Sequence, residues 1–440
     1  MENIKIKWLT KEDSWANIIG LFLVLILSIF WLFDMFFIIK IFNIKFNPWQ
    51  GINPINAFSS LSFLSFFALF CFFGICFGIA SKFLGKKIRT FLLSFSILFV
   101  LSIIVFLISS HTSAKEYQLE SPLVALLFGL VLGNLIRLPQ WFKDSLLTEF
   151  YIKTGIVLMG ATLPLTLLIS AGGIAILQAC IITIITFWTI YFAATRIFKL
   201  NPSFGVTLGA GGSICGVSAA IVIGSAAKAK QEHISLTISI VVLWAVVMVI
   251  VLPILCRILG LDAGVAGAWI GTSEFADSAG LAAAQSIGDE RAIAAFTLIK
   301  VIGRDMFIGI WAVLVAFLSI TMWNKQENAQ ANIKTIWERF PKFILGFLIA
   351  SALISALTLN LDSIANAQFS KESLGVIKTL RNWLFVWTFL CIGLNTQFKD
   401  IFVIGTKPFL AFTIGVAINL PLGYFLSSYV FYDFWVNFMK

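Results

Sequence analysis

Charged residues and histidines are scarce in this chain. Only 12% of its 440 residues are charged, and it holds two histidines. It lacks a GxxxxGK[ST] phosphate loop, an HExxH zinc pair and an aspartate-rich metal–diphosphate motif. The six cysteines show neither metal nor disulfide spacing, and two histidines give a serine–histidine hydrolase little to work with. We therefore expect no enzymatic activity, no bound metal and no cofactor other than a coupling ion.

Apolar residues, by contrast, are abundant. They make up 60% of the chain, with 45 phenylalanines and a mean hydropathy of +0.98. Runs of about 17 to 25 apolar residues fit a hydrocarbon core of about 30 Å, and period-2 alternation is missing. The sequence predicts an all-α, polytopic membrane protein with segments at 17–39, 56–81, 91–110, 121–137, 150–168, 174–197, 203–226, 234–256, 264–287, 291–322, 341–360, 378–397 and 403–431.

The net charge of +10 is explained by membrane orientation. Lys and Arg near the ends of spans stay on the cytoplasmic side. An inside N-terminus also puts most basic connections inside, except Lys228 and Lys230. Either segment 203–226 is re-entrant or these two lysines border a cavity mouth. A multi-pass membrane location, with the lipid bilayer as partner and no nucleic acid, is the expectation.

An internal similarity predicts two repeats. Leu158-Met-Gly160-Ala-Thr-Leu-Pro-Leu165 and Cys391-Ile-Gly393-Leu-Asn-Thr-Gln-Phe398 align without gaps. An odd number of segments separates them, as inverted-topology repeats require, although stretches this short can also coincide by chance. The predicted organisation is residues 1–120 as additional N-terminal transmembrane helices, 121–260 as the first repeat region and 261–440 as the second.

A glycine cluster interrupts one predicted span. Gly209-Ala-Gly-Gly-Ser-Ile-Cys-Gly216 has four glycines in eight residues. Irregular backbone at membrane depth persists only where it is buried in protein or lines a cavity, and interrupted helices mark transporter binding sites. A half-helix starting near Gly212 would point its N–H groups at an anion; the alternative is close helix packing. The residues predicted to bind solute here are Gly211, Gly212, Ser213, Cys215, Gly216 and Ser218.

Two carboxylates follow in segment 264–287. Glu274 and Asp277 are three residues apart, which predicts one shared helical face, and Ser278 lies beside them. Such a face suits a coupling cation, H⁺ or Na⁺. The alternative is that the segment starts near a membrane surface, where an acid is simply solvated.

A third polar cluster is Lys300-Val-Ile-Gly-Arg304-Asp305 in segment 291–322. Lys300 and Arg304 are four residues apart, so they either attract an anion or form an ion pair with Asp277 or Asp305. In the second repeat region, Asn395 and Thr396 follow Gly393 and could break a helix there. The residues of these two stretches that are predicted to contact solute are Lys300, Arg304, Asn395 and Thr396.

These motifs resemble those of the YeiH-type sulfate exporter family. The likeness covers residues 121 to 431 and is carried by Gly-Gly-Ser-x-Cys-Gly216-x-Ser-Ala-Ala-Ile221, Trp269-Ile-Gly271-Thr, Asp277-Ser278-x-Gly-x-Ala-Ala-Ala284, Lys300-Val-x-Gly-Arg304-Asp305 and Ile392-Gly-Leu-Asn-Thr-x-Phe398. Many relatives carry a His-Glu pair with Gln where this chain reads Ser273-Glu-Phe-Ala-Asp277, which leaves the substrate open.

The resemblance implies a bacterial inner-membrane carrier with two inverted repeats and helices interrupted near the midplane. We expect a secondary active transporter of a small anion, of the sulfate or organosulfonate type, coupled to H⁺ or Na⁺. A passive anion channel is the alternative, and a membrane-embedded transferase using Glu274 and Asp277 is a third reading. Whether the chain forms a homodimer stays open.

Overall fold

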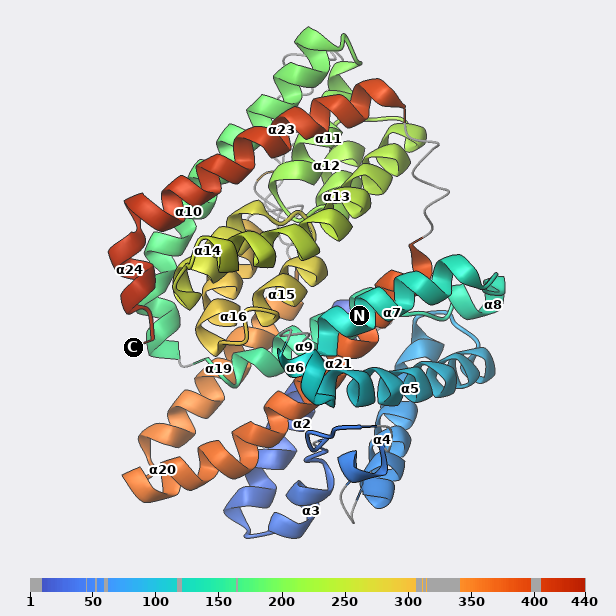
Figure 1. Cartoon of the computed structure of the whole chain (residues 1–440), viewed down its shortest axis with the longest axis vertical. Coiled ribbons are helices and arrows are strands. Elements are labelled where there is room, and N and C mark those ends of the chain that lie inside the picture. The colour runs from blue at the N-terminus through green and yellow to red at the C-terminus, as the bar shows by residue number, and fades with distance from the viewer. Residues whose placement is uncertain are drawn as a thin grey trace, which may run out of the picture. The chain divides into compact units, whose positions relative to one another are not determined.

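The chain folds into helices in two compact units. The computed structural model describes residues 10–44, 46–51, 54–58, 62–116, 121–163, 165–305, 311, 314, 341–396 and 405–439. Unit 1 combines Met1–Leu168 with Lys342–Gln397, and unit 2 combines Ile169–Pro341 with Phe398–Lys440. No strand forms within the described ranges, which confirms the all-α class (Figure 1).

Six helices of the described residues are long and apolar enough to cross a membrane. The described part of each predicted segment overlaps at least one helix, so the polytopic membrane class is confirmed. Residues 306–310, 312–313 and 315–322 of segment 291–322 lie outside the described residues. The six candidate spans are Glu12–Leu32, Phe63–Phe83, Ile88–Ser110, Ile169–Ile197, Glu232–Ile258 and Thr406–Val430.

Unit 1 is built around α21 (Gly375–Asn395), which packs against α5 (Ile88–Ser110), α7 (Ser121–Leu135) and α9 (Thr148–Gly160). Glycines permit the closest of these contacts. A Cβ added at Gly129 of α7 would lie 3.1 Å from the Cα of Gly393 on α21. The other helices of unit 1 are α2 (Glu12–Leu32), α3 (Phe36–Ile41), η1 (Pro54–Ala57), α4 (Ser62–Phe83), α6 (Thr112–Glu116), α8 (Gln140–Lys143), α19 (Phe343–Leu359), α20 (Ser363–Phe369) and η6 (Ser370–Leu374).

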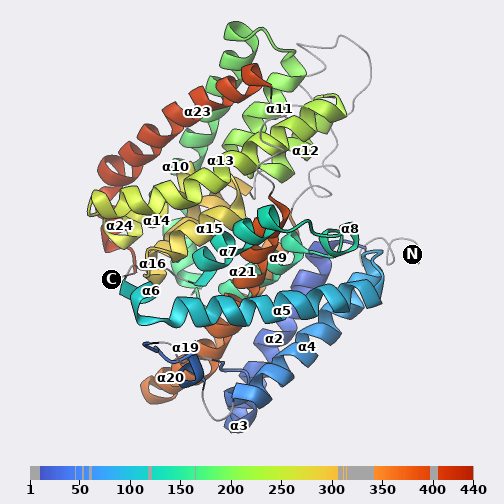
Figure 2. The ribbon, with the colours of Figure 1, turned by 45° about the vertical axis from the view of Figure 1, so that its right-hand side comes forward.

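An aromatic core joins the N-terminal helices to α21. Figure 2 shows α4 and α5 side by side in this unit. The ring centroids of Phe106 on α5 and Trp383 are 4.5 Å apart, and those of Phe73 on α4 and Trp387 are 5.1 Å apart. Both tryptophans are fully buried. The additional helices predicted for residues 1–120 therefore form an integral part of unit 1.

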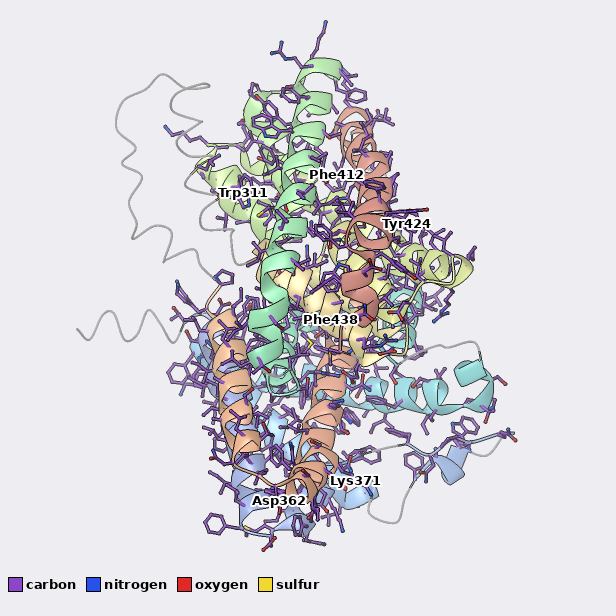
Figure 3. All side chains as sticks on the ribbon, turned by 90° about the vertical axis from the view of Figure 1, so that its left-hand side faces the viewer. Trp311, Asp362, Lys371, Phe412, Tyr424 and Phe438 are labelled. Atoms are coloured by element: carbon purple, nitrogen blue, oxygen red, sulfur yellow. The ribbon has the colours of Figure 1, made fainter. Side chains whose placement is uncertain are left out.

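Unit 2 holds the two long helices α10 (Leu165–Phe192) and α23 (Thr406–Phe425), which are joined by a polar contact. The Asn419 amide on α23 donates to the Thr186 hydroxyl on α10 at 2.9 Å. Figure 3 shows Phe412 and Tyr424 along α23. The other elements of unit 2 are η2 (Ala193–Ile197), α11 (Pro202–Ser213), α12 (Val217–Ala226), α13 (Gln231–Ile258), α14 (Ala263–Ser273), α15 (Asp277–Gln285), α16 (Glu290–Thr297), η3 (Leu298–Arg304), η7 (Leu426–Val430) and α24 (Tyr432–Asn437).

One arginine ties together the starts of α14 and α16. Asp262 and Asp289 cap these helices by accepting from the backbone N–H groups of Gly264 and Arg291. The Arg291 guanidinium forms ion pairs with both carboxylates at 3.1–3.2 Å. Burial alone would raise the pKa of Asp289, but the hydrogen bonds and charge of Arg291 lower that pKa below its ordinary value. Arg291 thus holds the N-terminal ends of the two helices together.

The units do not coincide with the predicted repeat regions, because each takes segments from early and late parts of the chain. The described residues of the two similar stretches lie in unit 1, at the ends of α9 and α21, and these two helices pack together. The inverted repeat itself stays a prediction, as do the boundaries 121–260 and 261–440.

Candidate functional site

The predicted glycine-rich break is present between α11 and α12. Helix α11 ends at Ser213, Ile214 leaves helical geometry at φ −108° and ψ −97°, and Gly216 has φ +69° and ψ −113°. Only glycine adopts that last conformation readily. The second half-helix begins at Val217, later than the predicted start near Gly212. The glycines before Ser213 therefore belong to the first half-helix.

A second break, which the sequence did not predict, lies between α14 and α15. Helix α14 ends at Ser273, Glu274 is extended at φ −83° and ψ 139°, and α15 begins at Asp277. The prediction that Glu274 and Asp277 share one helical face is therefore wrong, because the helix stops between them. The two carboxylates instead sit on either side of the break.

The two breaks meet backbone to backbone. A Cβ added at Gly216 would lie 2.6 Å from the carbonyl oxygen of Phe275 and 2.9 Å from Val241. Real side chains do not tolerate an approach of 2.6 Å, so both the conformation and the close contact require glycine at position 216. Four half-helix ends consequently converge on one buried region of unit 2.

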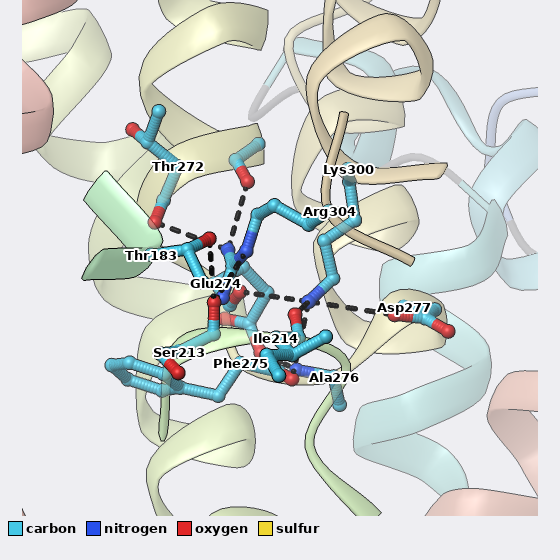
Figure 4. Close-up of polar contacts among 11 residues, drawn as sticks. Thr183, Ser213, Ile214, Thr272, Glu274, Phe275, Ala276, Asp277, Lys300 and Arg304 are labelled. Atoms are coloured by element: carbon cyan, nitrogen blue, oxygen red, sulfur yellow. Dashed lines mark hydrogen bonds and ion pairs between the residues drawn. The ribbon is translucent and has the colours of Figure 1, made fainter. Parts of the chain in front are cut away.

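Lys300 bridges the two breaks. Its ammonium donates to the carbonyl of Ile214 at 2.7 Å in the first break, and to those of Phe275 at 3.3 Å and Glu274 at 3.5 Å in the second (Figure 4). Carbonyls at helix C-termini lack intrahelical partners and carry partial negative charge. The cation therefore satisfies groups that interruption of both helices sets free.

Arg304 makes a parallel bridge one turn away. Its Nε donates to the Ser213 carbonyl at 3.0 Å, and its Nη1 contacts the carbonyls of Gly271, Thr272 and Glu274 at 3.0–3.1 Å. The Thr183 hydroxyl on α10 donates to the same Ser213 carbonyl at 3.1 Å. The hydrogen bonds of both predicted cations thus go to backbone carbonyls at or just after the ends of α11 and α14.

The π-helical element η3 carries both cations and packs on α10. A Cβ at Gly303 would lie 2.6 Å from the Cβ of Ala179. Since Gly303 lies between Lys300 and Arg304 in sequence, its close contact with α10 fixes the distance of η3 from that helix.

Three acids surround these cations. The Asp277 carboxylate forms an ion pair with Lys300 at 3.4 Å, and its side chain is 25% exposed while that of Lys300 is fully buried. Glu274 is also fully buried, and one of its oxygens accepts from the Ala276 N–H at 3.1 Å. Asp305, at the end of η3, is 2% exposed.

Several buried polar atoms at the breaks have no hydrogen-bond partner among the described residues. Buried polar groups are nearly always satisfied in folded proteins, so each exception calls for an explanation. The atoms are Ser213 Oγ, Glu274 Oε2, Arg304 Nη2 and both carboxyl oxygens of Asp305. Donors and acceptors are both among them, so the region has unused capacity for an anion and for a cation.

The remaining predicted residues fall into three groups. Gly211 and Gly212 are buried packing positions, where a Cβ at Gly212 would lie 2.9 Å from the Phe412 ring. Cys215 is buried beside the acids and Lys300, whereas Ser218 is exposed. The side chain of Ser278 lies outside the described part of the structure.

Asn395 and Thr396 belong to unit 1 and lie at the end of α21. Asn395 is exposed, and the Thr396 carbonyl accepts from the Asn134 amide at 3.0 Å. The helix does end where the sequence suggested a break. The described contacts of these two residues are all made within unit 1.

Sequence reasoning missed three contributors to the site. Thr183 and Asn419 lie on long apolar helices, and Asn419 donates to the Thr272 carbonyl at 3.3 Å. Single polar residues in apolar spans were the available signal. Asp305 was noted only as a counter-ion, because its burial depends on the tertiary fold.

Fold and site together define an α-helical polytopic membrane protein in which two interrupted helices meet at a buried charged cluster. The chain belongs to the family described as Conserved hypothetical protein 698, whose model matches residues 93–412. The more specific resemblance to sulfate exporters is left as a proposal.

Three relatives illustrate this membership, each called a UPF0324 membrane protein. The one from Rhodopirellula baltica is 34% identical over 81% of this chain and 67% of its own length. One from Nitratidesulfovibrio vulgaris is 30% identical over 82% and 62%, and one from Nitrosomonas europaea is 27% identical over 77% of each chain. The chain thus spans about two thirds of the length of the first two relatives. No solved structure matches.

Proposed function

We propose that this protein is a secondary active transporter that moves a small anion, of the sulfate or organosulfonate type, across the bacterial inner membrane, coupled to H⁺ or Na⁺. The observation that supports this most is the meeting of two interrupted helices at a buried cluster of charges. Transporters place substrate and ion sites at discontinuous helices of this kind.

The electrostatics of the half-helices favour an anion. Lys300 and Arg304 neutralise the negative C-terminal ends of α11 and α14. The N-terminal ends of α12 and α15 begin at the same place, and each carries N–H groups without intrahelical partners and a partial positive charge. Once the carbonyl ends are neutralised, these amide ends are what the cluster offers to an incoming anion.

Unused donors support the same interpretation. Ser213 Oγ and Arg304 Nη2 are buried and make no hydrogen bond to any residue that the structure describes. An anion oxygen near the start of α12 would accept from both. Arg304 would then contact solute with one nitrogen while its other nitrogens hold the helix ends.

The acids provide the coupling function. Asp277 is the most exposed of the three and is paired with Lys300. A proton or Na⁺ arriving at Asp277 would compete with the Lys300 ammonium for the same carboxylate. Binding of the coupling ion at Asp277 would therefore change the contacts that Lys300 makes at both breaks.

The test is uptake of labelled sulfate into proteoliposomes containing the purified protein, with and without a pH or Na⁺ gradient. We expect saturable uptake that one of the gradients accelerates. Asp277→Asn removes the charge that binds the coupling ion, so accumulation driven by the gradient should be lost, whereas Asp433→Asn, at an exposed position of α24, should not change it.

Two outcomes would contradict the proposal. Conductance that neither saturates nor responds to a gradient would indicate a passive channel. Coupled uptake that persists unchanged in Asp277→Asn would remove this residue from the mechanism.

A further inference from the structure

Asp305 is the least explained side chain of the cluster. It is 2% exposed, and neither of its carboxyl oxygens has a hydrogen-bond partner within the described ranges. An isolated ionised carboxylate is very unfavourable in an apolar interior, and such a group takes up a proton or pairs with a charge. The proposed function assigns Asp305 no role, so its burial needs a separate reason.

The groups that face Asp305 come from three elements. Asp277 approaches from the start of α15, Lys300 and Arg304 from η3, and Cys215 from the first break. Both aspartates lie beside Lys300: the Asp305 N–H donates to the Lys300 carbonyl one π-helical turn earlier, and the Lys300 ammonium is paired with Asp277 at 3.4 Å. Two carboxylates that share one site do not both ionise readily, so one of them retains a proton.

The charges of the cluster point to one missing positive charge. Glu274, Asp277 and Asp305 together carry three negative charges when ionised, against two on Lys300 and Arg304. The ammonium of Lys300 is already shared between Asp277 and the carbonyls of both breaks. One proton would make these five groups neutral as a set.

Exposure separates the two aspartates. The Asp277 side chain is a quarter exposed, whereas Asp305 is almost completely buried. Water can therefore deliver a proton to Asp277 but not directly to Asp305. Asp277 can thus receive a proton from water, and the buried Asp305 can then accept that proton from Asp277.

We propose that Asp277 and Asp305 hold one exchangeable proton between them, and that this proton is the coupling ion of the transporter. The second half of this statement rests on the proposed function, whereas the first does not. A proton from water binds a carboxylate oxygen of Asp277 and passes to a carboxylate oxygen of Asp305. Asp277 is left ionised and paired with Lys300, and Asp305 is left as the neutral acid.

The position of the proton changes the forces on both helix breaks. While the proton is on Asp277, that carboxyl is neutral and the Lys300 ammonium is attracted mainly by the carbonyls of Ile214 and Phe275. After transfer to Asp305, the ionised Asp277 again attracts Lys300 away from them. Lys300 thereby transmits the protonation state to the two half-helix junctions.

The test is infrared difference spectroscopy of the purified full-length protein in lipid as the pH is changed. A buried protonated carboxylic acid gives a carbonyl-stretch band that shifts in deuterated water. We expect one such band in the wild type and its loss in both Asp305→Asn and Asp277→Asn. Asp433→Asn, which removes an exposed carboxylate of the same unit, should leave the band unchanged.

The outcomes separate this inference from the proposed function. A band that survives Asp305→Asn, or that disappears instead in Glu274→Gln, would overturn the sharing of a proton by the aspartate pair. If Asp305→Asn does not fold, the wild type still decides, because the absence of any such band at every pH is also a negative result. Sulfate uptake plays no part in this measurement, so a failure to transport sulfate leaves the band as evidence.

Discussion

At the scale of single residues, Gly216 meets two independent requirements. Its φ of +69° with ψ −113° lies in a region that other residues rarely adopt, and its α-hydrogen faces the Phe275 carbonyl of the second break. Lys300 then connects the carbonyls of Ile214 and Phe275 on either side of this contact. The junction of the two interrupted helices thus depends on one missing side chain and one buried cation.

Gly216→Ala should destabilise the protein. The backbone strain alone is about 1–3 kcal/mol, and the added methyl group would also press on the Phe275 carbonyl. We expect a lower midpoint of thermal unfolding in detergent. Gly173→Ala is the matched control, because that glycine lies within helix α10 with no atom within 4 Å of the added Cβ. Equal midpoints for the two variants would refute the close approach of the breaks.

Glycine was the most informative residue type at this scale, because its conformational freedom predicts local structure without tertiary contacts. The glycines from 209 to 216 predicted an interruption, and the structure has it at Ile214 to Gly216. Asp305 was different, because its burial arises when η3 packs against α14 and α16, and no local pattern encodes that packing. The roles assigned to the predicted binding residues stay predictions.

At the scale of elements, the half-helices α11 and α14 end on the same guanidinium. Arg304 contacts the carbonyls of Ser213, Gly271, Thr272 and Glu274 at 3.0–3.1 Å. The guanidinium is a planar fork of donors with a fixed geometry, so its separate nitrogens contact the ends of both helices in defined directions. Arg304 therefore determines how the two C-terminal ends lie relative to each other.

Arg304→Lys should keep the charge but lose part of this arrangement. Hydrogen bonds to charged groups contribute about 1.5–3 kcal/mol each, and unsatisfied buried carbonyls add a desolvation penalty. We expect a loss of at least about 2 kcal/mol in unfolding free energy on this basis. Arg196→Lys, at an exposed position of η2, should change it little. Similar stabilities for these two lysine variants would show that the fork is not needed.

The sequence predicted which long segments are helical, but it did not predict every point at which a helix is interrupted. The apolar runs located the long helices among the described residues, because hydrophobicity is the main signal for segments that enter a membrane. Short helices between the runs, such as α8 and α20, were not predicted. The break at Glu274 was missed because neither glycine nor proline marks it; Gly271 and Gly280 lie outside it. There the carbonyls are satisfied by Arg304 and Lys300 from another element, so the interruption is a tertiary effect.

At the scale of the whole molecule, the two units have different kinds of core. Unit 1 is filled by aromatic side chains, with Trp383 and Trp387 of α21 surrounded by phenylalanines of α4 and α5. Unit 2 encloses polar groups instead, including Thr183, Lys300 and Asn419. Two interrupted helices meet at the buried Lys300 and Arg304 in unit 2, whereas the buried Arg381 of unit 1 donates to Thr162 just after the end of α9.

The most direct test of a solute pathway at the helix breaks uses Cys215, which is buried between Ile214 and Gly216. In a variant whose other five cysteines are replaced by serine, a membrane-impermeant thiosulfonate is applied to right-side-out and inside-out vesicles. If the breaks open to each side in turn during transport, Cys215 should react in both vesicle orientations, and sulfate should slow the reaction. No reaction in either orientation, with full labelling after denaturation, would show a dry, closed core and contradict transport through this site.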